Sequence, residues 1–147
     1  MRKLPLVLCA GVVLLSAGWR LPQGQQGTKR PVSIHFKCET GGGATVTINP
    51  WRRQLGARTD SIQWTLVTPG PGDSAPDSVL IAPKSVNQWP FTSGFPISVK
   101  TSKPGVAQGI QATVPAGTYK YSVTGICKFP GMAPDTVVID PDMIIPT

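Results

Sequence analysis

The chain has 147 residues, and 14 lysines and arginines against 7 acidic residues give it a formal net charge of +7. A chain of this length forms one domain with a modest core. Nucleic-acid binding needs a continuous basic stripe with interleaved aromatic residues, and the cations here are scattered, so that class of partner is not expected. The positive charge is interpreted as an aid to solubility, with a mild attraction to anionic surfaces.

The start of the chain has the order of a secretory signal peptide over residues 1–18. A basic start, Met1-Arg2-Lys3, precedes an apolar run at 4–15, and small residues follow at 16–18. The apolar run has 12 residues, whereas about 20 are needed to cross a bilayer. We therefore predict cleavage near Gly18, a periplasmic or extracellular location, and no membrane span in the mature chain.

Residues 19–31 are polar and lack periodicity, which is typical of a flexible tether. The folded domain is predicted to cover 32–147, because alternating apolar and polar residues begin at Val32. In this first strand the apolar face holds Val32, Ile34, Phe36 and Cys38, and the polar face holds Ser33, His35 and Lys37. Comparable patterns predict strands at 44–49, 61–67, 79–83, 97–100, 110–114, 118–124, 135–140 and 142–146.

The segments between these strands carry turn chemistry. Glycine and proline contribute 16 residues each and fall between the apolar segments. The glycine-rich stretch at 40–45 is predicted to be a hairpin loop and 68–78 a turn-rich loop. No sustained helical period follows the signal sequence. The fold class is therefore all-β, a Greek-key β-sandwich of about seven to nine strands.

Two cysteines remain after removal of the signal peptide, Cys38 and Cys127. An isolated even pair in an exported protein indicates a disulfide bond. We predict that Cys38 and Cys127 form that bond.

The last third of the domain resembles the cupredoxin family. "VPAGTYKYSV" at 114–123, a proline and glycine loop, and "TVVID" at 136–140 are similar to that family's Gly-x-Tyr-x-Tyr strand, metal loop and final strand. "DSIQWTLV" at 60–67 is similar to its tryptophan-bearing strand. The resemblance implies a cupredoxin-like β-sandwich, in outline over 32–140.

The copper ligands of that family are not matched. A blue copper site uses two imidazoles, one thiolate and usually an axial methionine. The family's thiolate comes two residues after the second aromatic residue, and that position is Val123 here. The chain's one histidine, His35, lies on the first predicted strand, so we expect neither a metal nor another cofactor.

These observations predict an exported, non-enzymatic cupredoxin-like module that binds another envelope or extracytoplasmic protein and docks on the outer face of a membrane or envelope complex. Trp51, Arg52 and Arg53 are the candidate partner surface, because tryptophan and arginine are enriched at interface hot spots. Trp89 and Phe91, which flank a proline, are expected to turn inward over the core.

Two other functions compete with this one. The first is electron transfer by an atypical copper site built from His35, Cys127 and Met132, which requires Cys127 to be a free thiolate. The second is an enzyme acting on envelope polymers, for which Asp140 and Asp142 are the only close pair of carboxylates.

Overall fold

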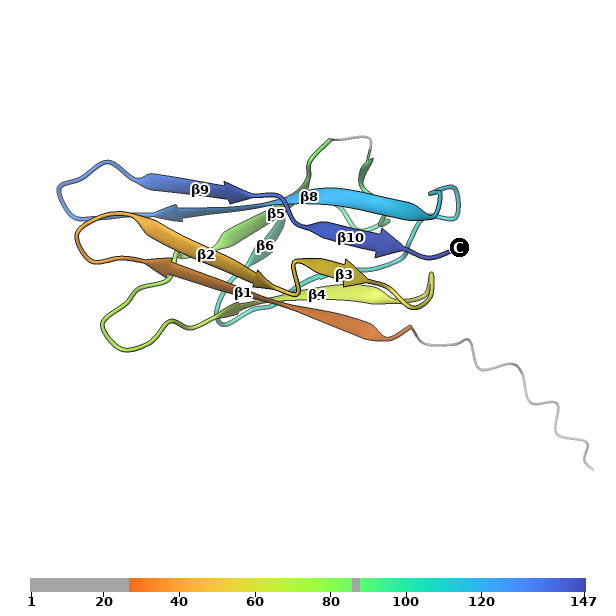
Figure 1. Cartoon of the computed structure of the whole chain (residues 1–147), viewed down its shortest axis with the longest axis horizontal. Coiled ribbons are helices and arrows are strands. Elements are labelled where there is room, and N and C mark those ends of the chain that lie inside the picture. The colour runs from red at the N-terminus through yellow and green to blue at the C-terminus, as the bar shows by residue number, and fades with distance from the viewer. Residues whose placement is uncertain (1–26, 86–87) are drawn as a thin grey trace, which may run out of the picture.

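The computed structural model describes residues 27–85 and 88–147, so the predicted signal peptide and most of the predicted tether lie outside it. The described residues form ten β-strands in two layers and no α-helix, which confirms the all-β prediction (Figure 1). The strands are β1 (Lys29–Cys38), β2 (Ala44–Asn49), β3 (Arg52–Gln54), β4 (Ser61–Val67), β5 (Val79–Pro83), β6 (Ile97–Val99), β7 (Gly105–Ala107), β8 (Gly117–Cys127), β9 (Asp135–Ile139) and β10 (Asp142–Ile145).

The first layer is a four-stranded sheet in the order β2-β1-β4-β7. β1 runs antiparallel to β2 and parallel to β4, so this sheet is mixed. The alternation predicted for the first strand is confirmed, because Val32, Ile34, Phe36 and Cys38 are all buried. The opposite face of β1 carries His35 and Lys37 and looks away from the second layer.

The second layer has six strands in the order β3-β10-β8-β5-β6, with β9 also paired to β8. β9 and β10 lie along the same edge of β8 and keep one register, with Val138 opposite Thr124 and Asp142 opposite Lys120. They are therefore two halves of one strand, interrupted where Pro141 offers no backbone N–H. Figure 1 shows β9 continuing into β10 along β8.

The core between the layers is closed by aromatic side chains. Trp64 of β4 meets Tyr121 of β8 edge to face, with ring centroids 5.5 Å apart, and stacks on Trp89 at 6.4 Å. Trp89 and Phe91 are buried, which confirms the prediction that they turn inward. Gly125 is required where β8 passes Phe36, because a Cβ there would lie 2.2 Å from the phenyl ring.

Three strand predictions need correction. Residues 52–54 and 105–107 form short strands that were not predicted, and 110–114 is not a strand. In that last segment the Val114 N–H donates to the Gln111 carbonyl in a turn, and the Arg58 guanidinium donates to both the Gln111 and Val114 carbonyls. Those carbonyls are therefore unavailable for a strand ladder.

The predicted tether is too long by at least three residues. Residues 29–31 belong to β1, where they pair with 61–63 of β4. Pro31 is tolerated because β2 does not reach this part of β1, so its missing N–H breaks no second ladder. Asp60 also holds the start of β1 in place, because it accepts hydrogen bonds from the Thr28 N–H and the Arg30 guanidinium.

Candidate functional site

The disulfide bond between Cys38 and Cys127 is confirmed, with the two Cα atoms 5.5 Å apart. It joins the end of β1 to the end of β8 and so links the two layers. The connections 39–43, 68–78 and 128–134 gather at this end of the sandwich (Figure 1). Gly41, Gly42 and Gly43 all have φ near 100° in the first of them, which explains the run of glycines at the tip of the predicted hairpin.

Val123 stands where the resemblance places a copper thiolate. Its side chain is fully buried, and its strand neighbours are Ile81 of β5 and Ile139 of β9. This part of β8 therefore contributes to an apolar core.

The residues of the alternative copper site are spread over different surroundings. Cys127 is bonded to Cys38, so its sulfur is not a free thiolate. His35 lies on the outer face of the four-stranded sheet. Met132 is exposed in the 128–134 loop, where its sulfur approaches Gly42.

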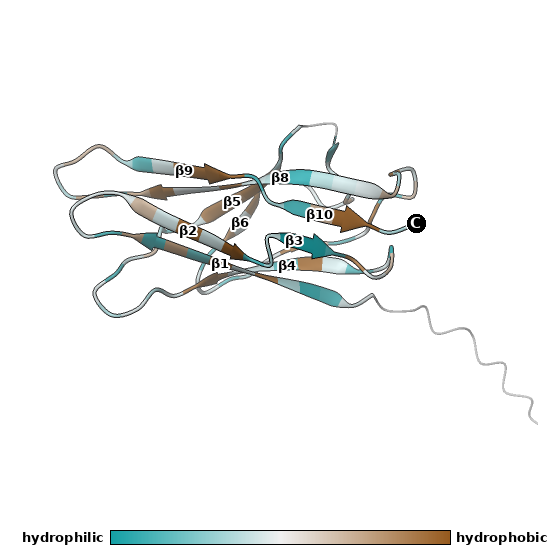
Figure 2. Cartoon of the chain, in the orientation of Figure 1, coloured by the Kyte–Doolittle hydropathy of each residue, from teal (hydrophilic) through white to brown (hydrophobic). Residues whose placement is uncertain are grey.

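The candidate partner surface lies where the chain crosses from β2 of one layer to β3 of the other. Trp51 is 50% exposed, whereas Trp64 and Trp89 are buried. The Trp51 carbonyl accepts a hydrogen bond from the Asp142 N–H at 3.1 Å, so the backbone at this tryptophan is fixed. Figure 2 shows β3 as a hydrophilic strand beside the apolar part of β10.

The two arginines next to Trp51 have different roles. Arg52 is exposed, and its guanidinium donates to Asp142 Oδ2 from both Nη2, at 3.1 Å, and Nε, at 3.3 Å. The Arg53 side chain lies on the opposite face of β3 from that of Arg52, and its guanidinium donates to the Pro31 carbonyl of β1. Arg53 therefore connects the layers, and only Arg52 is presented on the surface beside Trp51.

The carboxylates of Asp140 and Asp142 both belong to a charged cluster on the outer face of the six-stranded sheet. Asp140 accepts hydrogen bonds from Lys84 Nζ and from Ser122 Oγ. The hydrogen bond from Lys84 lowers the pKa of Asp140 despite the opposing effect of burial. Asp142 lies between Arg52 and Lys120, whose Nζ is 4.0 Å from Oδ1. A general acid needs a raised carboxyl pKa, so Asp140 does not have the properties of one.

Aliphatic side chains continue the same outer face beyond the charged cluster. Leu80, Thr124 and Val138 are opposite one another on β5, β8 and β9, and Ile126 follows Thr124 on β8. Leu80, Ile126 and Val138 are all exposed. Sequence patterning gave no reason to single them out, because an isolated exposed aliphatic residue is ordinary and only the pairing register brings these three together.

Tyr121 is a further buried polar group, at the centre of the core. Burial raises the pKa of its phenol to about 12. The nearby Trp64 indole lowers the pKa of Tyr121, but by less than burial raises it. Within the described part of the chain, neither Trp64 Nε1 nor the Tyr121 hydroxyl has a hydrogen-bond partner of acceptable geometry. The phenol is therefore neutral at any physiological pH.

Within 27–85 and 88–147, no group of three or more His, Cys, Asp or Glu side chains could hold a metal ion. The same residues contain no helix long and apolar enough to cross a membrane. No family model, no curated protein and no solved structure matches this chain. The β-sandwich architecture is thus established by the structure itself.

Proposed function

We propose that the chain is an exported, non-enzymatic β-sandwich of cupredoxin-like fold that binds another extracytoplasmic protein. The observation that carries the proposal is the half-exposed Trp51 beside Arg52, whose guanidinium is already held by Asp142. Side chains fixed before binding lose little conformational entropy when a partner covers them.

Export is supported by the signal-like order of residues 1–18 and by the Cys38–Cys127 disulfide, which is compatible with an oxidising compartment. The cupredoxin-like assignment is supported by the two mixed sheets and by the packing of Trp64 against Tyr121, which are two of the aromatic residues on which the resemblance rests.

The adjoining outer face of the six-stranded sheet suits a protein partner. It carries a charged cluster in which Arg52, Lys84, Lys120 and the partly buried Asp140 are accessible and Asp142 is buried between Arg52 and Lys120. The exposed aliphatic side chains of Leu80, Ile126 and Val138 lie next to this cluster. A polar region next to an apolar one is the usual composition of a protein interface. The cluster carries three cations against two acids, so an acidic partner surface is favoured.

The test is capture of partners from an envelope extract by immobilised mature protein. Trp51→Ala combined with Arg52→Ala should lose the captured protein, because burying the exposed half of a tryptophan contributes about 2 kcal/mol, or roughly 30-fold in affinity. Met132→Ala is the matched control, since Met132 is similarly exposed but lies in the 128–134 loop. Equal capture by the double variant and the wild type would show that this surface is not the interface.

A further inference from the structure

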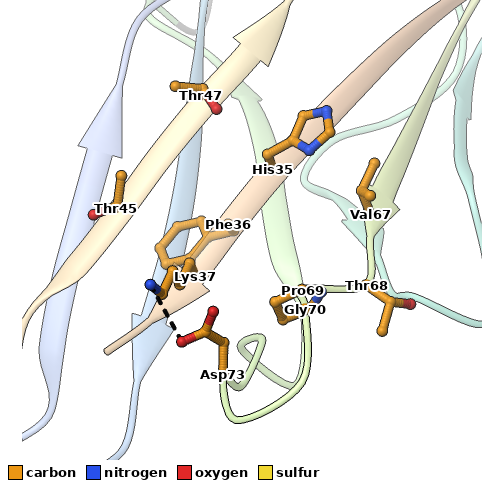
Figure 3. Close-up of a pocket in the computed structure, with 10 residues that line it drawn as sticks. All are labelled: His35, Phe36, Lys37, Thr45, Thr47, Val67, Thr68, Pro69, Gly70 and Asp73. Carbon is orange, nitrogen blue, oxygen red and sulfur yellow. Dashed lines mark ion pairs between the residues drawn. The ribbon is translucent and has the colours of Figure 1, made fainter. Parts of the chain in front are cut away.

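A hollow of about 250 Å³ lies on the outer face of the four-stranded sheet, on the opposite side of the sandwich from the charged cluster around Asp140 and Asp142 (Figure 3). Its floor is formed by β1 and β2 and by the end of β4. The segment 68–73, which follows β4, folds back beside β1 and forms its wall. The chain's one histidine, His35, is on the floor.

The wall of the hollow is held in place by specific contacts. Asp73 Oδ1 lies 3.2 Å from Lys37 Nζ, and the Cys38 N–H donates to the Ser74 carbonyl at 2.7 Å. The Asp73 N–H closes a turn with the Gly70 carbonyl at 3.2 Å. Because Cys38 is also in the disulfide, the segment is attached to the most constrained end of β1.

The floor has hydrogen-bonding groups on one side and an apolar surface on the other. His35 is opposite Thr47 on β2 and opposite Val67 on β4. Pro69 extends the apolar side. Within the described residues, no side-chain hydrogen bond engages His35 or Thr47, although the neighbouring Thr45 hydroxyl donates to Glu39 at 2.8 Å. The imidazole and the Thr47 hydroxyl are therefore available to a ligand.

The charges around the hollow favour a neutral ligand. Lys37 is paired with Asp73, and the next charged residue in the chain is Glu39, just beyond the end of β1. The Asp73 carboxylate would repel an anion, and the Lys37 ammonium group would repel a cation. A purely apolar ligand would leave the imidazole, the hydroxyl and the ion pair without partners, which costs binding energy.

We propose that this hollow binds one neutral pyranose unit of a carbohydrate. A pyranose has a C–H face that matches Val67 and Pro69, and hydroxyl groups that can both donate and accept hydrogen bonds with His35, Thr47 and the exposed atoms of the Lys37–Asp73 pair. The hollow is somewhat smaller than a typical drug-sized pocket, which limits it to a single sugar unit. Few groups line the hollow, so we expect weak binding, with a dissociation constant on the order of 1 mM.

The single histidine makes the test direct, because its ring signals in an NMR spectrum belong to His35 alone. Methyl α-glucoside, methyl β-galactoside and N-acetylglucosamine are titrated separately up to about 50 mM, well above the expected dissociation constant. At least one of them should shift the His35 ring signals to saturation. Thr47→Val, which keeps the side-chain shape, should weaken that binding at least tenfold, and so should Asp73→Asn.

Thr118→Val is the matched control, because Thr118 is an exposed strand threonine on β8 in the other sheet. It should bind the same sugar as tightly as the wild type. The proposal is overturned if none of the three sugars gives a saturable shift, or if both Thr47→Val and Asp73→Asn bind as the wild type does. The protein-capture experiment changes Trp51 and Arg52, which do not line the hollow. Failure of the sugar titration therefore leaves the proposed protein interface untouched, and failure of the capture experiment leaves the sugar proposal untouched.

Discussion

Replacement of Asp60 by asparagine is expected to destabilise the fold more than any exposed substitution. The Asp60 side chain is 3% exposed and accepts four hydrogen bonds. The donors are Arg30 Nε and the Gly56 N–H, each at 2.7 Å, the Thr28 N–H at 2.8 Å, and the Ala57 N–H at 3.2 Å. Asparagine has the same shape but replaces one acceptor oxygen by an NH₂ group. The hydrogens of that group would point toward the N–H donors that the carboxylate oxygen now accepts from.

The magnitude follows from the pKa of Asp60. Burial alone would raise it, but the hydrogen bonds from Arg30, Thr28, Gly56 and Ala57 outweigh burial and lower the pKa from 3.8 to about 2. At 1.36 kcal/mol per pKa unit, the ionised carboxylate contributes about 2 kcal/mol to the free energy of unfolding. Because the pKa is lower in the folded state, this contribution is complete above about pH 4 and is lost as the pH falls toward 2.

Urea unfolding at pH 7, followed by the fluorescence of the buried Trp64 and Trp89, measures this contribution. Asp60→Asn should lower the free energy of unfolding by about 2 to 4 kcal/mol, since a buried acceptor is lost and a donor is left unpaired. Asp77→Asn is the control, because the Asp77 side chain is 87% exposed and should change stability by less than about 0.5 kcal/mol. A loss at Asp60 no larger than at Asp77, or one that is undiminished at pH 2, would refute the reasoning.

Three further predictions concern the disulfide bond, the packing at Gly125 and copper binding. Changing Cys38 and Cys127 together to serine should lower the free energy of unfolding by about 4 kcal/mol, because the bond spans 89 positions; a change below about 1 kcal/mol in denaturant titrations would contradict this. Gly125→Ala should lower the free energy of unfolding by about 1 to 3 kcal/mol, because the added methyl group clashes with Phe36. Gly94→Ala is the control, since a methyl group there meets open space, and thermal melting compares the two variants. Copper(II) added to the oxidised protein should give no intense thiolate-to-copper absorption band, and the appearance of one would revive the copper alternative.

Much of the fold could be predicted from the sequence because local patterns and the tertiary structure agree there. The alternation at Val32, Ile34 and Phe36 gave the buried face of β1, and that around Trp64 did the same for β4. The cysteine pairing followed from count and compartment. In each case the information lies within a few residues, or in residue types that have only one possible partner.

The errors occur where distant residues decide the local structure. β3 is three polar residues whose ladder is supplied by β10, about 90 positions later. The segment 110–114 alternates as a strand does, but Arg58 takes the Gln111 and Val114 carbonyls. The same limit applies to the candidate surface, because nothing local indicates that Arg53 reaches across to Pro31 while Arg52 stays outside.

The hollow around His35 shows this limit for a site. A histidine on the polar face of a strand is ordinary, and sequence reasoning considered His35 only as a ligand of the alternative copper site, not as part of a hollow. The hollow arises because Asp73, 36 positions after Lys37, brings the 68–73 segment back against β1. The site therefore depends on a segment that packs against β1 from elsewhere in the chain, and not on a local sequence motif.

The central claim is that the domain meets a protein partner at Trp51. The most direct measurement places a photo-crosslinking amino acid at position 51, or at position 132 as the control, and irradiates intact cells that export the protein. The account predicts one discrete crosslinked protein from position 51 that is absent from position 132. The same set of crosslinks from both positions, or none from position 51, would contradict it.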